Sequence, residues 1–270
     1  MGIITEKIGR VVANYLDQEL ESYQPFSVHD TSILKKTLQP CDILLVEGNA
    51  RISSTIKYLT QSTWSHAAFF AGDIEGQTKD GESCCLIEAE LTEGVIATPI
   101  SKYQEFNTRI CRPVGLSEID KHKVVNYMVK SLGKQYDLKN ITDLLRYLVP
   151  LPIPSRFRRQ MIALGSGDPT RAICSSLIAQ AFQSVKYPIL PMIDRDKHNK
   201  ETYRQSEYEL FQIRHHSLFS PRDFDVSPYF AVIKPTIENN FNYKTLRWAH
   251  EDNSQRYIST EDIDSKLNNS

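Results

Sequence analysis

The sequence predicts an α+β fold, and three observations lead to that prediction. Short apolar runs typical of strands cluster between residues 42 and 112. Segments with helical periodicity lie on either side of this cluster, near the N-terminus and again from residue 117 onward. The order is therefore helix, clustered strands, helix, whereas a parallel sheet would show strands and helices in regular alternation.

Residues 1–36 are expected to form an N-terminal helical arm. Apolar side chains recur there at helical spacing, which predicts an amphipathic helix that docks on the body of the protein. These apolar positions are Ile8, Val11, Val12, Tyr15 and Leu16.

The chain shows no sequence feature of a secretory signal or a membrane span. The N-terminal segment contains Glu6, Lys7 and Arg10 and lacks a continuous apolar stretch. No window approaches about 18 uncharged apolar residues, the length that a spanning helix needs. We therefore expect a cytoplasmic protein, and export by a route that needs no Sec signal stays open.

Five short strands are predicted in the central region, each bounded by turn residues. A short helix over Arg51–Gln61 follows the first strand. A polar loop over Asp73–Glu82 separates the second strand from the third, and a Glu93-Gly94 turn follows the third. The predicted strands are Asp42–Val46, Ser65–Ala71, Cys84–Ala89, Val95–Thr98 and Arg109–Arg112.

Two longer helices and one more strand are predicted after this cluster. Ser117 caps a helix that runs to Leu132, and Gly133 is suited to end it. Ile173–Val185 carries one apolar stripe and predicts a helix buried against the sheet. Tyr229–Lys234 is the last predicted strand.

The domain boundaries follow from these elements and from shifts in composition. The main domain is placed at 37–235, with a basic, proline-rich insertion at about 138–171. The remaining residues, 236–270, form a polar tail that is expected to be disordered at its end, because it has few apolar residues to bury.

Composition and charge narrow the classes of partner and site. The formal net charge is -1, with 32 basic and 33 acidic residues, so we expect no nucleic-acid partner. The five cysteines are odd in number and form no CxxC pair, which argues against a structural zinc site and a disulfide framework. Reduced thiols, no metal and no organic cofactor are the expectation.

Cys174 is a candidate reactive thiol because it sits at the start of the predicted buried helix. A helix N-terminus carries partial positive charge and unpaired N–H groups, which lower a thiol pKa and can hold an oxyanion. The alternative is a buried structural cysteine, which is the commoner state of a free thiol, and position alone favours it.

His66 and Glu88 are the candidate partners of that thiol. His66 begins the second predicted strand and has the natural pKa range of a base, although a structural histidine is the simpler interpretation of the residue alone. Glu88 lies inside an apolar strand, where a buried carboxylate requires a partner such as an imidazole N–H. Glu90 has the same alternation and could serve instead, or both could face solvent.

Taken together, these segments resemble the YiiX-type permuted papain-like hydrolases. That family consists of circular permutants of the NlpC-type cell-wall peptidases and is related to the lecithin:retinol acyltransferase group. The resemblance covers about Leu38–Ser184 and touches Phe224–Lys234. It is carried by Asp42-Ile-Leu-Leu-Val, Trp64-Ser-His-Ala-Ala-Phe, Ile87-Glu-Ala, Gly94-Val-Ile, Gly133-Lys-Gln-Tyr-Asp and Ile173-Cys-Ser-Ser-Leu-Ile.

The resemblance implies a permuted papain-like fold, in which an antiparallel sheet or partial barrel packs against the nucleophile helix. It also implies a cysteine hydrolase that cleaves an amide (peptide or isopeptide) bond through an acyl-enzyme. The resemblance also implies that Cys174 is the nucleophile, His66 the general base and Glu88 the third member of a catalytic triad. Substrate-binding positions carry over to Tyr136, Trp64, Ser65 and Ser175.

The chain departs from the small bacterial members of the family in its insertion, N-terminal helix and acidic tail, and two alternative functions stay open. Leu144–Arg171 holds five arginines and one acidic residue among apolar side chains. Such a segment could touch an anionic membrane through the Arg156–Arg159 region, or it could be a solvated lid. The substrate could therefore be peptide-like or a lipid, the latter for an esterase or acyltransferase with the same triad. The second alternative is a catalytically silent binding module.

Overall fold

The computed structural model describes residues 31–90, 93–135, 173–190, 192–194, 210–212, 215–238, 247–249 and 257–259, and positions 18, 25, 242 and 244. The chain divides into two compact units, Met1–Ile233 and Lys234–Ser270. The amphipathic helix expected around residues 8–16 and the basic insertion expected at 138–171 lie outside the described residues. No helix in the described part of the chain is long and apolar enough to cross a membrane.

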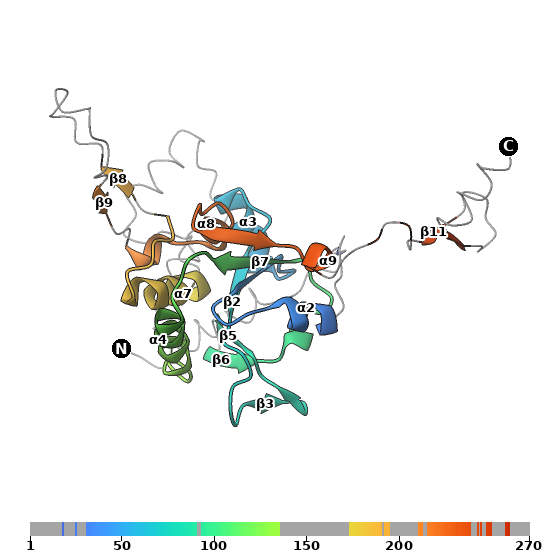
Figure 1. The fold of residues 1–270 in the computed structure, drawn as a ribbon, viewed down its shortest axis with the longest axis horizontal. Helices are drawn as coiled ribbons and strands as arrows, with labels where there is room; N and C mark the ends of the chain where they lie inside the picture. The colour runs from blue at the N-terminus through green and yellow to red at the C-terminus, as the bar shows by residue number, and fades with distance from the viewer. Residues whose placement is uncertain are drawn as a thin grey trace. The chain divides into compact units, whose positions relative to one another are not determined.

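The first unit is built on a six-stranded antiparallel sheet in the order β10–β7–β1–β2–β5–β6 (Figure 1). Each strand predicted from the sequence is present within one or two residues, and the α+β class is confirmed. The order ends at β10 and β6, so the described strands form an open sheet rather than a closed barrel. The strands are β1 (Ile43–Val46), β2 (His66–Phe70), β5 (Leu86–Glu90), β6 (Gly94–Thr98), β7 (Thr108–Pro113) and β10 (Phe230–Ile233).

Helices flank this sheet, and the two long ones match the sequence prediction. Ser117 caps the first of these two long helices by accepting a hydrogen bond from the Asp120 N–H, and that helix ends at Val129, three residues before the predicted end. The helices of the first unit are α2 (Thr31–Thr37), α3 (Arg51–Thr60), η1 (Ile100–Tyr103), α4 (Glu118–Val129), α7 (Ile173–Ser184), η2 (His216–Leu218) and α8 (Pro221–Asp225).

Two small hairpins lie outside the six-stranded sheet, the first of them at the polar loop predicted over Asp73–Glu82. Thr78–Lys79 (β3) pairs with Glu82–Ser83 (β4), and Met192–Asp194 (β8) pairs with Leu210–Gln212 (β9). The first hairpin turns through Asp80 and Gly81, which have φ angles of 52° and 81°. An Asp-Gly pair with positive φ at both positions is a two-residue hairpin turn, so this signal was available in the sequence.

The second unit contains a short helix and one hairpin. The helix is α9 (Pro235–Glu238), and the hairpin pairs β11 (Arg247–Ala249) with β12 (Tyr257–Ser259). The polar composition predicts an unstructured end to the chain, yet β12 lies within it. The β-forming residues Tyr257 and Ile258, paired with Trp248, account for this difference.

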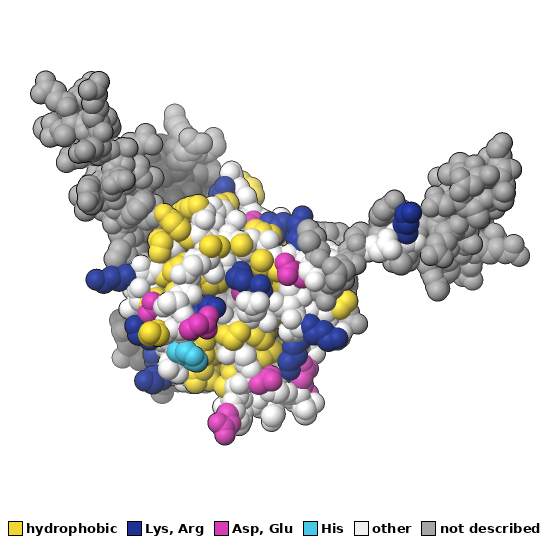
Figure 2. Space-filling view, viewed as in Figure 1, with side chains coloured by type: hydrophobic (Ala, Val, Ile, Leu, Met, Phe, Trp, Pro, Cys, Tyr) yellow, Lys and Arg dark blue, Asp and Glu magenta, His cyan; other side chains and the backbone are white. Residues whose placement is uncertain are grey.

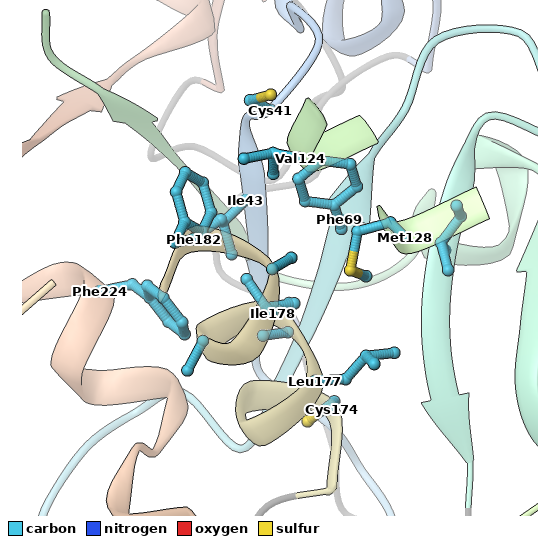
Figure 3. Packing of buried hydrophobic residues seen from close by; sticks show 14 of the residues in the cluster. Cys41, Ile43, Phe69, Val124, Met128, Cys174, Leu177, Ile178, Phe182 and Phe224 are labelled. Atoms are coloured by element: carbon cyan, nitrogen blue, oxygen red, sulfur yellow. The ribbon is translucent and has the colours of Figure 1, made fainter. Parts of the chain in front are cut away.

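The core has two layers, one on each face of the sheet. Side chains alternate along a strand, so Ile43 and Leu45 face one layer while Leu44 and Val46 face the other. The first layer is formed with α7 and α4, as the buried side chains around Phe182 show (Figure 3). The second layer is closed by α2 and η1. The sheet is therefore buried on both faces.

The outer edge of β6 is covered by the turn that follows α4. The Val95 N–H donates to the Lys134 carbonyl, and the Gly133 N–H donates to the Val95 carbonyl. Gly94 has a φ of 78°, and a Cβ there would lie 2.4 Å from the Lys134 carbonyl oxygen. Only glycine satisfies both demands, so Gly94 allows the turn to approach the strand.

Charged side chains of both signs are interspersed over the face shown in Figure 2, with hydrophobic side chains between them. One ion pair instead has a fully buried carboxylate, with its guanidinium partner only partly exposed. The Asp42 carboxylate is buried and accepts from Arg112 Nε at 2.9 Å and from Arg112 Nη2 at 2.7 Å. Arg112 also donates to the Thr37 carbonyl, so the pair ties β7 and β1 to the end of α2.

We predict that Asp42→Asn costs about 3 kcal/mol of unfolding free energy, because it leaves the Arg112 guanidinium without its carboxylate partner. Urea unfolding followed by circular dichroism measures this loss. Glu118→Gln is the matched control, since Glu118 pairs with Lys121 but its side chain is 78% exposed, and it should leave stability unchanged. Equal stability of the two variants would contradict the structural role of the buried pair.

Candidate active site

His66 and Glu88 meet at the end of the sheet where β2 begins. The Ser65 N–H donates to the Val46 carbonyl, which fixes the backbone just before His66. The imidazole Nε2 lies 2.6 Å from Glu88 Oε2, and the exposed fraction of the side chain is 23% for His66 and 0% for Glu88. The carboxylate is therefore held inside the protein, and the imidazole stands between it and the surface.

Two further side chains donate to the same carboxylate, both from η1. Lys102 Nζ lies 2.7 Å from Glu88 Oε1, and the Tyr103 hydroxyl donates to Glu88 Oε2. Lys102 also contacts Glu90, the next carboxylate on the same face of β5. Burial alone would raise the pKa of Glu88, but the hydrogen bond and charge of His66, together with the Lys102 charge, hold its pKa well below the usual range. Glu88 is an anion here at neutral pH.

Cys174 reaches this group from the first turn of α7. Its side chain is buried, with 5% of the residue exposed, and it lies at the end of the helix that Leu177 and Ile178 anchor to the core (Figure 3). The β2–β5 ladder covers only the pairs Phe69–Ile87 and Phe70–Leu86, whereas β5 pairs with β6 along its full length. Helix α7 contacts both of these strands.

The strand backbone supports the Cys174 sulfur directly. Ala67 lies beyond the β2–β5 pairs, and its backbone N–H helps to lower the pKa of the Cys174 thiol. The Ser175 hydroxyl lies 3.9 Å from the Cys174 Sγ and is fully buried. The imidazole of His66, the Ala67 N–H and the Ser175 hydroxyl each lower the pKa of the Cys174 thiol, against the opposing effect of burial.

The thiol and the imidazole shift each other toward the charged forms. Burial opposes charge on both groups, but the mutual attraction and hydrogen bond between Cys174 and His66 outweigh it, so the pKa of Cys174 is lowered and the pKa of His66 is raised. Glu88 adds to the rise at His66. Because Nε2 is engaged by Glu88, Nδ1 is the ring nitrogen left for the sulfur. The arrangement favours a thiolate–imidazolium pair.

The other four cysteines are buried without such a partner. Burial raises the pKa of Cys41 to about 12 and that of Cys85 to about 11, and it also raises the pKa of Cys84 and Cys111. All five cysteines are free thiols. Cys174 therefore differs from the rest in the direction of its shift, and the structure brings together the three residues that the sequence suggests as a cluster.

Of the other predicted site residues, Ser175 adjoins Cys174, while Trp64 and Ser65 directly precede His66 in the chain and use their polar atoms elsewhere. Trp64 is buried, donates from Nε1 to Asp225 Oδ2 at 3.0 Å and stacks under the Arg109 guanidinium. The Ser65 hydroxyl accepts from the Gly48 N–H at 2.9 Å. The polar atom of Trp64 thus engages α8 and that of Ser65 engages the Gly48 backbone, and the role of both residues in substrate binding stays a prediction. Tyr136 lies outside the described residues.

Lys102 and Tyr103 are the site residues that sequence reasoning missed. The rule that a buried carboxylate needs donors predicts partners for Glu88 but does not say which side chains they are. Both belong to the turn that follows β6, and only the packing of Ile100 and Tyr103 into the second core layer brings that turn beneath Glu88. No group of three His, Cys, Asp or Glu side chains that could hold a metal ion occurs in the described part of the chain.

These features define an α+β protein with an open antiparallel sheet and a Cys–His–Glu cluster at its end. No family model matches the chain, and no curated protein matches its sequence. Among solved structures, that of the metalloprotein yiiX from Escherichia coli O157:H7 is similar, with a TM-score of 0.43 and 17% identity. The match covers 73% of this chain and 97% of that one. The name of that protein is the one carried by the YiiX-type group that the sequence resembles, and the similarity concerns the fold alone.

The lowered pKa of Glu88 makes the stability of this cluster depend on pH. A carboxyl whose pKa falls on folding stabilises the protein above its unfolded value, about 4.5, and this contribution is lost as the pH falls toward the folded value. A histidine whose pKa rises on folding contributes fully below about 6.5, and its contribution declines as the pH rises above that value. Both contributions are therefore complete only between these two limits.

We predict that Glu88→Gln destabilises the protein by about 3 kcal/mol at pH 5.5 and by less at pH 3, because below the unfolded pKa of about 4.5 the carboxyl of the unfolded wild type is protonated and the contribution of Glu88 to stability is smaller. Chemical unfolding of both proteins at the two pH values measures the difference. Glu90→Gln is the control, because Glu90 is partly exposed and contacts only Lys102 among the cluster residues. A loss for Glu88→Gln that does not shrink at pH 3 would show that the carboxylate charge is not what stabilises the site.

A second prediction concerns thiol reactivity. At pH 7, iodoacetamide should alkylate Cys174 before the other four cysteines, because the thiolate is the reacting species and only Cys174 has a lowered pKa. Peptide mapping by mass spectrometry after short exposure identifies the modified residue. His66→Gln removes the imidazolium and should move the pH midpoint of alkylation up toward the ordinary thiol value of about 9. Preferential labelling of Cys84 or Cys85 would contradict the assignment.

Proposed function

We propose that this protein is a thiol-dependent hydrolase that cleaves an amide bond through a Cys174–His66–Glu88 triad. The observation that supports it most strongly is the buried Glu88 carboxylate, 2.6 Å from the imidazole that is paired with the Cys174 thiol. An ionised third residue holds the imidazole in one orientation and stabilises its protonated form, which is the role that a triad requires.

The proposed reaction has two halves. The Cys174 thiolate attacks the substrate carbonyl carbon, a C–S bond forms, and the carbonyl electron pair moves to oxygen. The first backbone N–H groups of α7, which have no partner within the helix, are suited to hold that oxyanion. When the oxyanion collapses, the C–N bond breaks, and His66 gives its proton to the departing amine. Water, deprotonated by His66, then attacks the thioester and releases the acid and the thiolate.

The protonation state of His66 favours an amide over an ester as the substrate. An amine leaves only if it receives a proton, and an imidazole with a raised pKa carries that proton at neutral pH. An alkoxide leaving group depends less on such a donor. Cleavage of a lipid ester by the same triad is therefore the second candidate, and the assay below separates the two.

The permuted papain-like arrangement belongs to the same proposal. The strand with the histidine precedes the helix with the cysteine in the chain, the sheet is antiparallel, and α7 packs on it with the nucleophile at its N-terminal end. These features agree with the permuted order of the resembled family, in which the histidine strand precedes the cysteine helix, the reverse of the order in papain.

We predict that turnover is lost in Cys174→Ala and falls roughly 10²- to 10⁴-fold in His66→Gln, the usual contribution of a general acid–base group. A panel of peptidyl anilides and isopeptides forms one arm of the assay, and phospholipid vesicles form the other. Intact-mass spectrometry during turnover should show an acyl group on the wild type and none on Cys174→Ala.

Cys84→Ala is the control for loss of a buried thiol that the reaction does not use. Release of amine with the acyl group on Cys174 supports the amidase proposal, whereas release of fatty acid alone would replace it with the lipid esterase. Equal activity of wild type and Cys174→Ala on every substrate would overturn the triad. A chain with no turnover that still binds a peptide would act as the silent binding module.

A further inference from the structure

Lys102 occupies a position that links two carboxylates of unequal exposure. Its ammonium contacts Glu88, whose side chain is fully buried, and Glu90, whose side chain is 30% exposed. The Lys102 side chain itself is 33% exposed, and its ammonium lies 5.4 Å from the centre of the Tyr103 ring. Lys102 therefore spans the boundary between the buried carboxylate and the surface.

We propose that Lys102 is a positioning residue, which holds Glu88 as an anion with Oε2 directed at His66 and thereby keeps Cys174 in its thiolate form. This inference rests on the proposed function, because it assigns a role within the same triad. Lys102 acts through Glu88 and His66 and takes no part in the bond-making steps.

The geometry separates the two oxygens of Glu88. Lys102 takes Oε1, while His66 and Tyr103 share Oε2. A carboxylate can rotate and exchange its oxygens unless each has its own partner. With an ammonium bound to Oε1, rotation would break a charge-assisted hydrogen bond, which is among the stronger polar contacts in proteins. Lys102 thus determines which oxygen the imidazole meets.

The charge balance points the same way. The charged and titratable groups that face Glu88 are His66 from β2, Lys102 and Tyr103 from η1, Glu90 from β5 and Cys174 from α7. Burial and the nearby carboxylates raise the pKa of Tyr103 well above its ordinary value, so it stays neutral. With the thiolate formed, three negative groups face two positive ones. Without Lys102, three would face His66 alone.

Removal of the Lys102 charge should therefore make the thiolate harder to form. An opposite charge within several ångströms shifts a pKa by about one to three units. Lys102 acts on Cys174 only indirectly, through Glu88 and His66. Loss of its charge is therefore expected to raise the pKa of Cys174 by about one unit or somewhat less. Burial opposes charge on Lys102, yet Glu88 and Glu90 raise its pKa, so it carries its charge throughout the range in which Cys174 titrates.

The experiment is the pH dependence of iodoacetamide alkylation at Cys174, followed by peptide mass spectrometry in the full-length chain. Lys102→Met keeps most of the aliphatic stem and removes the charge, and it should raise the pH midpoint by up to about one unit. Lys102→Arg restores a cation and should return the midpoint toward the wild-type value. Glu90→Gln is the matched control, because it removes a contact of Lys102 without removing the cation, and it should not raise the midpoint.

The outcomes separate this inference from the proposed function. An unchanged midpoint in a folded Lys102→Met protein, judged by its circular dichroism melt, would overturn the role of Lys102 while leaving the triad in place. An ordinary thiol midpoint in the wild type would instead overturn the triad. If Lys102→Met does not fold, Lys102→Gln, which keeps a hydrogen-bond donor without charge, provides the same test. A midpoint raised equally by Glu90→Gln would show that the contact network, and not the Lys102 charge, sets the thiol pKa.

Discussion

One buried carboxylate organises the described part of this protein. Glu88 has no exposed side-chain surface, and an unpaired charge in that position would cost several kcal/mol. It is accommodated because His66, Lys102 and Tyr103 all donate to it. The sheet register, the turn after β6 and the start of β2 must all be correct for these donors to converge. The same contacts that make the anion tolerable also orient the imidazole toward the thiol.

The second requirement is a gap in the sheet. If β2 and β5 paired along their whole length, the Ala67 N–H would serve the ladder and would not be available to sulfur. Pairing is confined to the Phe69 and Phe70 positions, and α7 contacts both strands. The buried stripe of α7, from Leu177 to Phe182, fixes the helix on the sheet, so the position of Cys174 follows from core packing.

Much of this could be predicted from the sequence, and the reasons for the rest are physical. Apolar runs and alternation predict the strands, and a carboxylate inside such a run predicts a partner, which leads to His66 and Glu88. The apolar stripe with helical periodicity that begins at Ile173 predicts that Cys174 lies at the N-terminal end of a helix. Lys102 and Tyr103 follow a strand without any pattern of their own, because their position depends on how one turn packs in the second core layer. The partners that engage the polar atoms of Trp64 and Ser65 are Asp225 of α8 and the Gly48 N–H, and no local sequence pattern identifies either of them.

The distance along the chain between His66 and Cys174 has a consequence for biosynthesis. A polypeptide leaves the ribosome from its N-terminus, so β2, β5 and η1 are made well before α7. Until α7 docks in the gap, its thiol has neither the imidazolium nor the Ala67 N–H beside it and keeps an ordinary, mostly protonated state. A nascent or misfolded chain therefore carries no activated sulfur, and thiol reactivity can serve as a direct measure of completed folding.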